Sequence, residues 1–228
     1  MEYILINLAL AVIAYLFGSF PSALVVGKAF RGLDLRKEGS GNLGTTNAIR
    51  VLGKKLGFFV FFLDLLKAVI VMLVVVFNAH LFNFNNLWHP MIFGIVSIFG
   101  HVYPIFTKFK GGKAVACSLA VCSVITPIPA LLCLVVFYIT LKISGYVSLS
   151  SLNATMTVFI GATIQIFVFG FNAETTAEKW FLFAIYFLMS AFIFYKHRTN
   201  IVKLLNGTEN NFKKKKQEKK EAELADSH

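Results

Sequence analysis

The sequence is poor in charged residues, and acidic residues are missing from its middle. Only 14% of the 228 residues are Asp, Glu, Lys or Arg, whereas soluble domains contain about a quarter. Between Leu65 and Ala173 there is no Asp or Glu, and long apolar runs fill most of this stretch. Because a bilayer core about 30 Å thick needs roughly 20 apolar residues per helix, the composition predicts one all-α polytopic membrane domain. It leaves no room for a sizeable soluble domain.

Cysteine is also scarce, and the first apolar run lacks a basic leader. Cys117, Cys122 and Cys133 lie in apolar stretches without C-x-x-C spacing, which predicts small core residues rather than disulfides or metal ligands. Glu2 is the only charged residue before Lys28, so the start of the chain has no basic n-region of a signal peptide. We therefore expect an uncleaved first membrane helix.

The net charge of +11 has two interpretations. Nucleic-acid binding would need a soluble basic face with aromatic residues beside it, but here the aromatic residues lie within the apolar runs. The positive-inside bias of membrane proteins explains the charge without such a face. The sequence thus favours a membrane protein with no nucleic-acid partner, and phosphate-bearing substrates are a further reason for basic loops.

Seven apolar segments follow one another along the chain. Pro21 interrupts the end of the first segment, since proline removes a backbone hydrogen bond. The fourth and fifth segments are each too short to span comfortably, and they meet at Pro127-Ile128-Pro129. The segments run roughly over 3–27, 56–78, 88–107, 114–126, 129–144, 149–171 and 179–195.

Basic residues gather in three of the polar segments. Segment 28–55 has seven basic and two acidic residues, segment 108–113 has three unopposed lysines, and segment 196–220 has nine basic and two acidic residues. Segment 79–89 has no Lys or Arg. The positive-inside rule places the three basic segments inside, the N-terminus outside and the C-terminus in the cytoplasm. Stretch 114–144 must then cross and return, which gives seven membrane helices, or five full spans plus a re-entrant hairpin.

The end of the chain differs in composition from the rest. We expect residues 1–210 to form the membrane domain and residues 211–228 to form a Lys-rich, disordered cytoplasmic tail. Such a tail attracts anionic lipid by about 1 kcal/mol per basic side chain near the surface. A purely solubilising role explains the same composition equally well.

The first basic segment contains the run 39–47, GSGNLGTTN, followed by Arg50. Glycines let backbone N–H groups approach an anion closely. Ser40, Asn42 and Asn47 add side-chain donors, and Arg50 adds a bidentate guanidinium. We interpret the run as an anion-binding loop; the alternative is an ordinary flexible polar loop.

The second basic segment ends in Lys110-Gly111-Gly112-Lys113, directly before an apolar helix. Two ammonium groups around a flexible glycine pair, at the positive end of a helix dipole, favour phosphate binding. The Walker A spacing is absent, and the glycines could instead form a hinge.

The third basic segment contains His197 and Asn200, which would share a face on a continuing helix. His197 is a candidate general base or anion ligand, although an isolated histidine at a membrane boundary is more often passive. Ser148 falls at the same predicted inner face.

Asp64 and Lys67 lie three residues apart in an apolar run, and either a functional site or a mutually neutralising structural pair explains them.

The sequence lacks the residues that several other reaction classes require. The basic segments hold no paired carboxylates, which argues against a divalent metal site and carboxylate catalysis. No G-x-S-x-G motif occurs, and Phe106 and Val202 stand where the common H-x-x-x-x-D acyltransferase motif would need aspartate. A CDP-alcohol phosphotransferase would need clustered aspartates. A transporter for a phosphorylated metabolite remains an alternative, but it should carry polar residues through the midplane of several helices.

Three runs resemble, in order and spacing, the three motifs of the acyl-phosphate:glycerol-3-phosphate acyltransferase (PlsY-type) family. They are 40–47, SGNLGTTN; 100–113, from Gly100-His101 to KGGK; and 197–209, from HRTNI to Glu209. The resemblance covers about residues 1–210. It implies transfer of a fatty acyl group from acyl phosphate to the 1-hydroxyl of glycerol 3-phosphate, giving lysophosphatidic acid at the cytoplasmic side of a bacterial inner membrane. It implies membrane lipid as surroundings, no cofactor, no metal, and work beside the enzyme that makes acyl phosphate.

The resemblance also implies roles for single residues. The catalytic residues would be Ser40, Arg50, Lys110 and His197, and the base would be either His197 or the phosphate of the substrate. The substrate-binding residues would be Gly41, Asn42, Asn47, Gly111, Gly112, Lys113, Ser148, Asn200 and Glu209. Two positions depart from the family pattern: Thr45 stands where alanine is usual and Ala114 where glycine is usual. Ala114 is expected to restrict the backbone at the end of the second motif.

Overall fold

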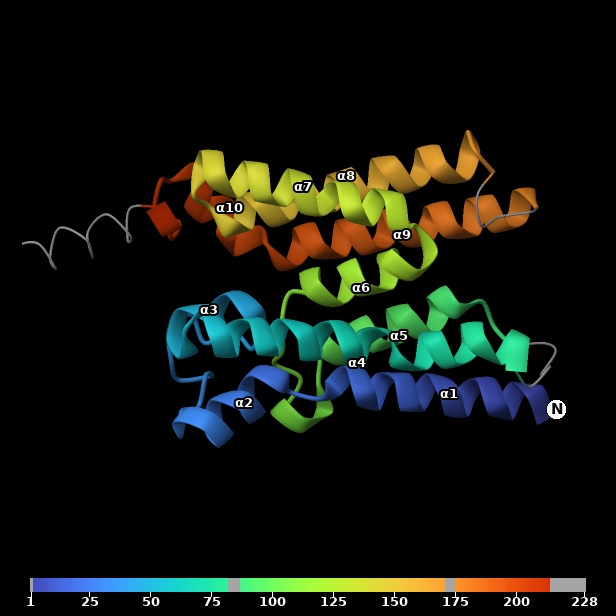
Figure 1. Cartoon of the computed structure of the whole chain (residues 1–228), viewed down its shortest axis with the longest axis horizontal. Coiled ribbons are helices and arrows are strands. Elements are labelled where there is room, and N and C mark those ends of the chain that lie inside the picture. Colours follow the sequence, from blue (N-terminus) through green and yellow to red (C-terminus); the bar gives the residue numbers. More distant parts are fainter. Residues whose placement is uncertain (1, 82–86, 171–174, 214–228) are drawn as a thin grey trace, which may run out of the picture. The chain divides into compact units, whose positions relative to one another are not determined.

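The computed structural model describes residues 2–81, 87–170 and 175–213, and every regular element in these ranges is a helix. The all-α class predicted from composition is therefore confirmed. The chain divides into two compact units, Met1–Ile125 and Thr126–His228 (Figure 1).

In its described residues, 2–81 and 87–125, the first unit contains six α-helices and one 3-10 turn. Helix α1 ends just before Pro21 and α2 begins just after it, so the break predicted at this proline is confirmed. The elements are α1 (Glu2–Ser19), α2 (Ser22–Arg31), α3 (Thr45–Leu52), α4 (Lys54–Leu81), α5 (Pro90–Val102), η1 (Ile105–Thr107) and α6 (Val115–Ile125).

Helices α1 and α5 pack closely because each presents a glycine to the other. A Cβ added to Gly18 would lie 2.0 Å from the carbonyl oxygen of Ser97, and one added to Gly100 would lie 2.4 Å from that of Tyr15. Small residues at a crossing let backbones approach, as is typical of helices in membranes. Helix α4 packs against both of them and against α6, so it forms the centre of the unit.

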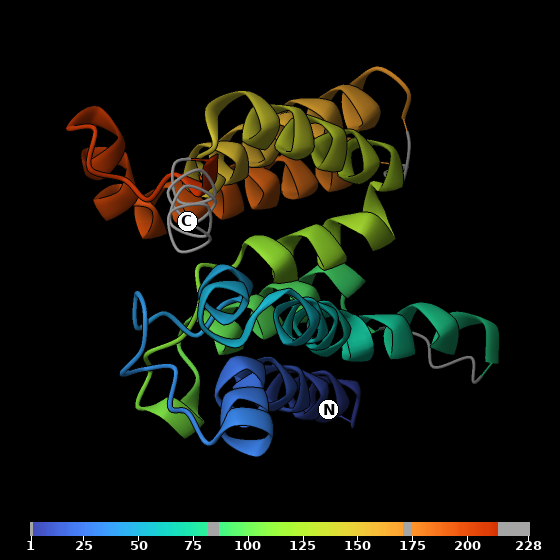
Figure 2. The same cartoon turned by 60° about the vertical axis from the view of Figure 1, so that its left-hand side comes forward.

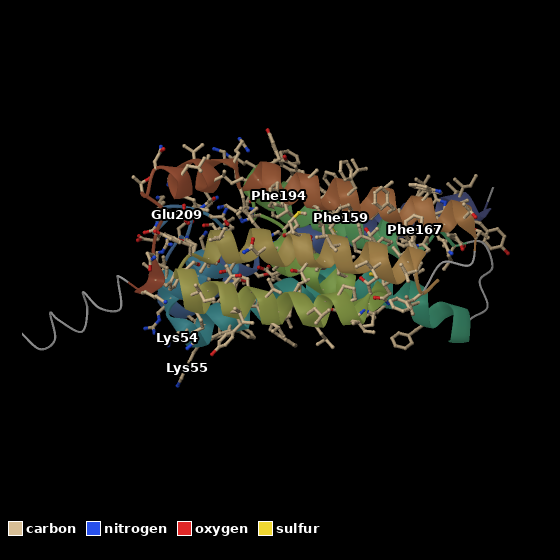
Figure 3. All side chains as sticks on the ribbon, turned by 90° about the horizontal axis from the view of Figure 1, so that it is seen from above. Lys54, Lys55, Phe159, Phe167, Phe194 and Glu209 are labelled. Atoms are coloured by element: carbon tan, nitrogen blue, oxygen red, sulfur yellow. The ribbon has the colours of Figure 1, made fainter. Side chains whose placement is uncertain are left out.

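A separate apolar cluster joins the loop-rich end of this unit. It consists of Ala23, Leu24, Val26, Leu35, Leu43, Ala48, Leu52 and Val60. These residues come from α2, the connection 32–44, α3 and the start of α4, so the long polar connection is held on an apolar base. Lys54 and Lys55 are exposed and project outward from the start of α4 (Figure 3).

The second unit is built from α7 (Pro127–Ser144), α8 (Val147–Phe167), α9 (Thr176–Lys196) and α10 (Arg198–Leu205). Helix α8 packs against both α7 and α9. Phe159 and Phe167, eight residues apart on α8, face rings of α9 (Figure 3). The ring centroids lie 5.7 Å apart for Phe159 and Phe183, and 5.2 Å apart for Phe167 and Trp180. These aromatic contacts hold the two long helices together.

Six helical stretches of the described residues are long and apolar enough to cross a membrane, and α6 is a shorter apolar helix. One expectation is corrected: the fifth apolar segment is not short. Helix α7 begins at Pro127 and has 18 residues, because a proline in the first turn of a helix lacks only an N–H that would be unpaired there anyway. The number of crossings and the orientation of the termini remain predictions.

The predicted tail begins with residues that the structure describes. The backbone N–H of Phe212 donates to the carbonyl oxygen of Gly145 at 2.9 Å, and Asn211 Nδ2 donates to that of Ser144 at 3.0 Å. Residues 211–213 are therefore fastened to the connection between α7 and α8. The remainder of the tail, 214–228, lies outside the described residues, and its predicted disorder remains a prediction.

Candidate functional site

Two basic loops meet at one end of the first unit. The first, which we call the serine loop, is the connection 32–44 between α2 and α3; the second, the glycine–lysine loop, covers 103–114 between α5 and α6. Asn42 Nδ2 in the first loop donates to the carbonyl oxygen of Gly111 in the second at 3.5 Å. Figure 2 shows both loops at the same end of the unit. The prediction that these two basic segments share a face is confirmed.

Asn47 holds the serine loop in shape from the first turns of α3. Its Oδ1 accepts from the backbone N–H of Ser40 at 2.9 Å, and its Nδ2 donates to the carbonyl oxygens of Leu35 and Glu38 at 3.3 and 3.1 Å. The side chain is 2% exposed. Asn47 therefore organises the backbone around Ser40, while its predicted contact with substrate remains a prediction.

The glycine–lysine loop rests on the C-terminal end of α5. The backbone N–H of Gly112 donates to the carbonyl oxygen of His101 at 3.1 Å, and Thr107 Oγ1 donates to that of Lys110 at 2.9 Å. Ala114 ends the loop with φ of 70° and is fully buried. A side chain in this left-handed conformation costs roughly 1–2 kcal/mol, which agrees with the expected restriction at this departure from the family pattern.

The two loops enclose a cavity of about 410 Å³, within the size range of small-molecule sites. Its eight lining residues include three cations and no Asp or Glu. They are Arg36, Ser40, Gly41, Asn42, Thr107, Lys108, Lys110 and Gly111. The structure thus brings together five residues predicted from sequence, and the lining favours a small polar anion.

Sequence interpretation missed three of the lining residues. In the sequence, Arg36 and Lys108 contribute only to the charge of their segments. The unopposed lysines beside glycines in segment 108–113 were a usable signal for Lys108, whereas Arg36 has Asp34 two residues before it and gave none. Thr107 gave no such signal. The remaining predicted residues of this unit, Asn47, Arg50, Gly112 and Lys113, are not among the residues that line the cavity.

Arg36 is held at the cavity by Asp34. Arg36 Nη2 lies 2.5 Å from Asp34 Oδ2, and Arg36 Nε donates to Asp34 Oδ1 at 2.9 Å. These bonds to the guanidinium hold the pKa of Asp34 well below its usual range, and the same contact raises the pKa of Arg36. The ion pair with Asp34 fixes the orientation of the Arg36 guanidinium. Lys108 and Lys110 supply positive charge that no carboxylate of the described residues neutralises.

His197 lies in the second unit at a break between two helices. It ends α9 with φ of −98° and ψ of 3°, and α10 starts at Arg198. The condition under which His197 and Asn200 would share a face of one continuing helix is therefore not met, because α9 ends at His197 and Asn200 lies in α10. Nδ1 of His197 lies 2.8 Å from the carbonyl oxygen of Ile193. A carbonyl can only accept, so Nδ1 carries the proton and Nε2 carries the lone pair of the neutral ring.

Asn200 and Glu209 are bound to each other. Asn200 Nδ2 donates to both carboxylate oxygens of Glu209, at 3.0 and 3.1 Å. This contact ties the segment after α10 back to α10 and does not involve the side-chain carbonyl oxygen of Asn200.

Ser148 lies in the first turn of α8 and is 6% exposed. Its hydroxyl makes no hydrogen bond to any described residue.

The candidate residues of each unit allow a different kind of chemistry. Cations and loop N–H groups in the first unit can bind phosphate and stabilise negative charge, and Nε2 of His197 can accept a proton. Within the described residues, no three His, Cys, Asp or Glu side chains are grouped closely enough to hold a metal ion.

Comparison with known proteins gives one consistent result. The family model described as glycerol-3-phosphate acyltransferase matches residues 8–207. Glycerol-3-phosphate acyltransferase 3 of Bacillus anthracis is 43% identical over 209 residues, covering 90% of this chain and 96% of the relative. The glycerol-3-phosphate acyltransferase of Staphylococcus carnosus is 39% identical, covering 86% and 93%.

Two solved structures are similar over nearly the whole chain. Both are crystal structures of PlsY (YgiH), an integral membrane glycerol 3-phosphate acyltransferase. The glycerol 3-phosphate form has a TM-score of 0.76 and 39% identity, covering 90% of this chain and 95% of the other. The lysophosphatidic acid form has a TM-score of 0.74 and 36% identity, covering 90% and 94%.

Proposed function

Since the chain belongs to the glycerol-3-phosphate acyltransferase family of integral membrane proteins, we propose that its acyl donor is acyl phosphate and its product is lysophosphatidic acid. The observation that carries the proposal is the cavity lined by Arg36, Lys108 and Lys110 and by no carboxylate. The three cations of the lining match the phosphate groups of acyl phosphate and of glycerol 3-phosphate.

The chemistry of acyl phosphate fits the residues that are available. Acyl phosphate is a mixed anhydride with a good leaving group, so no covalent enzyme intermediate is needed. The 1-hydroxyl of glycerol 3-phosphate attacks the acyl carbon, an ester bond forms, and the bond to phosphate breaks to release inorganic phosphate. Lys110 and Arg50 stabilise the developing negative charge, and positioning supplies much of the acceleration.

The proton of the attacking hydroxyl has two possible acceptors. One is Nε2 of His197, which carries a lone pair because Nδ1 donates to the carbonyl oxygen of Ile193. The other is the phosphate of the substrate itself. With either acceptor, the 1-hydroxyl attacks the acyl carbon in the same way. The two alternatives differ in how much the rate of acyl transfer falls when the imidazole of His197 is removed.

The proposed active site faces the cytoplasm of a bacterial cell. The cavity of the first unit binds the phosphate groups, and the family resemblance implies further substrate contacts for Ser148, His197 and Asn200. The positive-inside bias of the loops 28–55 and 108–113 supports this orientation. The acyl chain then lies in the membrane, and the enzyme that makes acyl phosphate would work beside it.

Purified protein incubated with acyl phosphate, glycerol 3-phosphate and EDTA tests the proposal. We expect lysophosphatidic acid and inorganic phosphate in equal amounts, and no product when acyl-CoA or acyl carrier protein replaces acyl phosphate. Formation of product only from a thioester would refute acyl phosphate as the donor. Loss of activity in EDTA would refute the metal-free mechanism.

His197→Ala decides between the two proton acceptors. A general base contributes about 10²- to 10⁴-fold to a rate, so we expect kcat to fall at least 100-fold with both KM values nearly unchanged if His197 is the base. Retention of most activity at unchanged KM values would assign the proton to the substrate phosphate.

A further inference from the structure

Two charged side chains are buried together in the middle of α4. Asp64 and Lys67 are 1% and 7% exposed, and Lys67 Nζ lies 2.8 Å from Asp64 Oδ1. Ser22 Oγ donates to Asp64 Oδ1 at 2.9 Å, and Lys67 Nζ donates to the carbonyl oxygen of Phe20 at 2.7 Å. The predicted pairing is confirmed, and the pair also fastens α4 to the break between α1 and α2.

Asp64 also lies close to residues at both ends of the glycine–lysine loop. His101 lies in the last turn of α5, before the loop, with Nδ1 3.7 Å from Asp64 Oδ1. Cys117 lies in the first turn of α6, after the loop, and its Sγ donates to the backbone oxygen of Asp64 at 3.3 Å. One position on α4 therefore lies beside a residue that precedes the loop and a residue that follows it.

The imidazole of His101 lies between this charged pair and the glycines of the loop. A Cβ added to Gly112 would lie 1.9 Å from Nε2 of His101, and one added to Gly111 would lie 2.1 Å from the His101 carbonyl oxygen. The backbone of the loop is thus in direct contact with the ring. The ring is 5% exposed, so its orientation determines where the loop can lie.

Stability alone does not explain charged residues at this depth. Ionisable side chains inside a membrane segment are costly, and replacement of a buried ion pair by neutral residues of similar volume is often neutral or stabilising. Helix packing around α4 could be satisfied by apolar side chains. A role for Asp64 and Lys67 in orienting a neighbouring functional group would explain why these charges are present.

We propose that Asp64, Lys67 and His101, which we call the loop anchor, are positioning residues that hold the glycine–lysine loop in its phosphate-binding geometry. The loop supplies Lys108, Lys110 and Gly111 to the cavity, so the anchor sets the substrate affinity without touching substrate. The inference rests on the proposed function, because it assigns the loop to a phosphorylated substrate of acyl transfer.

The test begins with Lys110→Met, which removes a cation from the cavity. The substrate whose KM rises in this variant is the one that the loop binds. The variant Asp64→Asn/Lys67→Met then removes both charges of the anchor at nearly constant volume. We expect it to raise the same KM about tenfold while the unfolding temperature in detergent stays close to that of the wild type.

The histidine is tested with a conservative and a disruptive substitution. His101→Asn keeps a polar side chain beside Asp64 and leaves room for Gly112, so we expect this KM to stay within about threefold of wild type. His101→Leu keeps bulk without a polar atom, and we expect a rise of about tenfold. Combining His101→Leu with the double variant should add nothing further, because residues that act as one unit are non-additive.

Tyr186→Phe is the matched control for loss of a buried polar contact. Tyr186 and Thr126 share a hydrogen bond of 2.7 Å in the second unit. Its loss should lower the unfolding temperature and leave both KM values unchanged. If Asp64→Asn/Lys67→Met does not fold, the contrast between His101→Asn and His101→Leu carries the test alone.

The outcomes separate the two proposals. Wild-type protein without acyl transfer from acyl phosphate, or Lys110→Met with kcat and both KM values unchanged, would overturn the proposed function. A rise in KM for Lys110→Met, with wild-type KM values in the double variant and in His101→Leu, would overturn the loop anchor alone. Multiplicative effects of the combined substitutions would also overturn it.

Discussion

Gly112→Ala should disable the enzyme without unfolding it. The added methyl group would lie 1.9 Å from Nε2 of His101, 2.6 Å from Cε1 and 2.9 Å from Cδ2. Contacts this short do not occur between atoms that are not bonded. The His101 ring is 5% exposed and lies 3.7 Å from the buried carboxylate of Asp64, so the loop has to move rather than the ring.

The required displacement sets the expected magnitude. Ordinary van der Waals contact begins at 3.4 Å, so the loop at Gly112 must shift by about 1.5 Å. A misplacement of about 1 Å can cost roughly 100-fold in rate, equivalent to about 2.7 kcal/mol in the activation free energy. We therefore expect kcat/KM for acyl transfer to fall at least 100-fold.

Steady-state kinetics with acyl phosphate and glycerol 3-phosphate measure this loss, and thermal unfolding in detergent measures stability. Gly161→Ala on α8 is the control, because a Cβ there would lie 3.0 Å from Pro129 Cβ and needs only a small adjustment. Alanine is also a better helix former than glycine by about 1 kcal/mol. We expect the control to retain kcat/KM within about twofold.

Wild-type kcat/KM in Gly112→Ala would refute the argument, because the loop could then not depend on direct contact with the ring. Loss of folded protein would also count against it, since the clash lies in a loop at the end of the unit. Partial recovery of kcat/KM in Gly112→Ala/His101→Asn would support it, because the shorter side chain leaves room for the methyl group.

Two further predictions concern α3 and the loop before it. Asn47→Ala removes the three hydrogen bonds that hold Ser40, Leu35 and Glu38. At about 1 kcal/mol for each bond, we expect the free energy of unfolding to fall by about 2–3 kcal/mol and KM to rise. An unchanged unfolding temperature would contradict this role of Asn47. Thr45→Ala removes a buried hydroxyl that has no hydrogen bond to a described residue, so we expect an unfolding temperature higher by a few degrees at constant kcat/KM. A fall in kcat/KM would instead place the hydroxyl in contact with substrate.

The sequence by itself determined the class of protein and the identity of its main loops. Lack of charge and long apolar runs require helices, because only internally hydrogen-bonded segments survive in lipid. The break at Pro21 followed from the missing N–H of proline, and the pairing of Asp64 with Lys67 followed from their spacing on a helix. Unopposed lysines beside glycines identified the glycine–lysine loop, because local composition suffices to indicate anion binding.

Only the tertiary structure decided which loop residues line the cavity and which support them. The residue type alone predicts Asn47 as a substrate ligand, and only the structure shows that its amide holds the backbone of its own loop. Arg36 and Lys108 looked like general charge, and they line the cavity. Spacing along the chain could not show either result, because both depend on how residues distant in sequence fold against each other. The contact of His101 with Gly112 and Asp64 has the same origin: it exists only where α4, α5 and the loop come together in space.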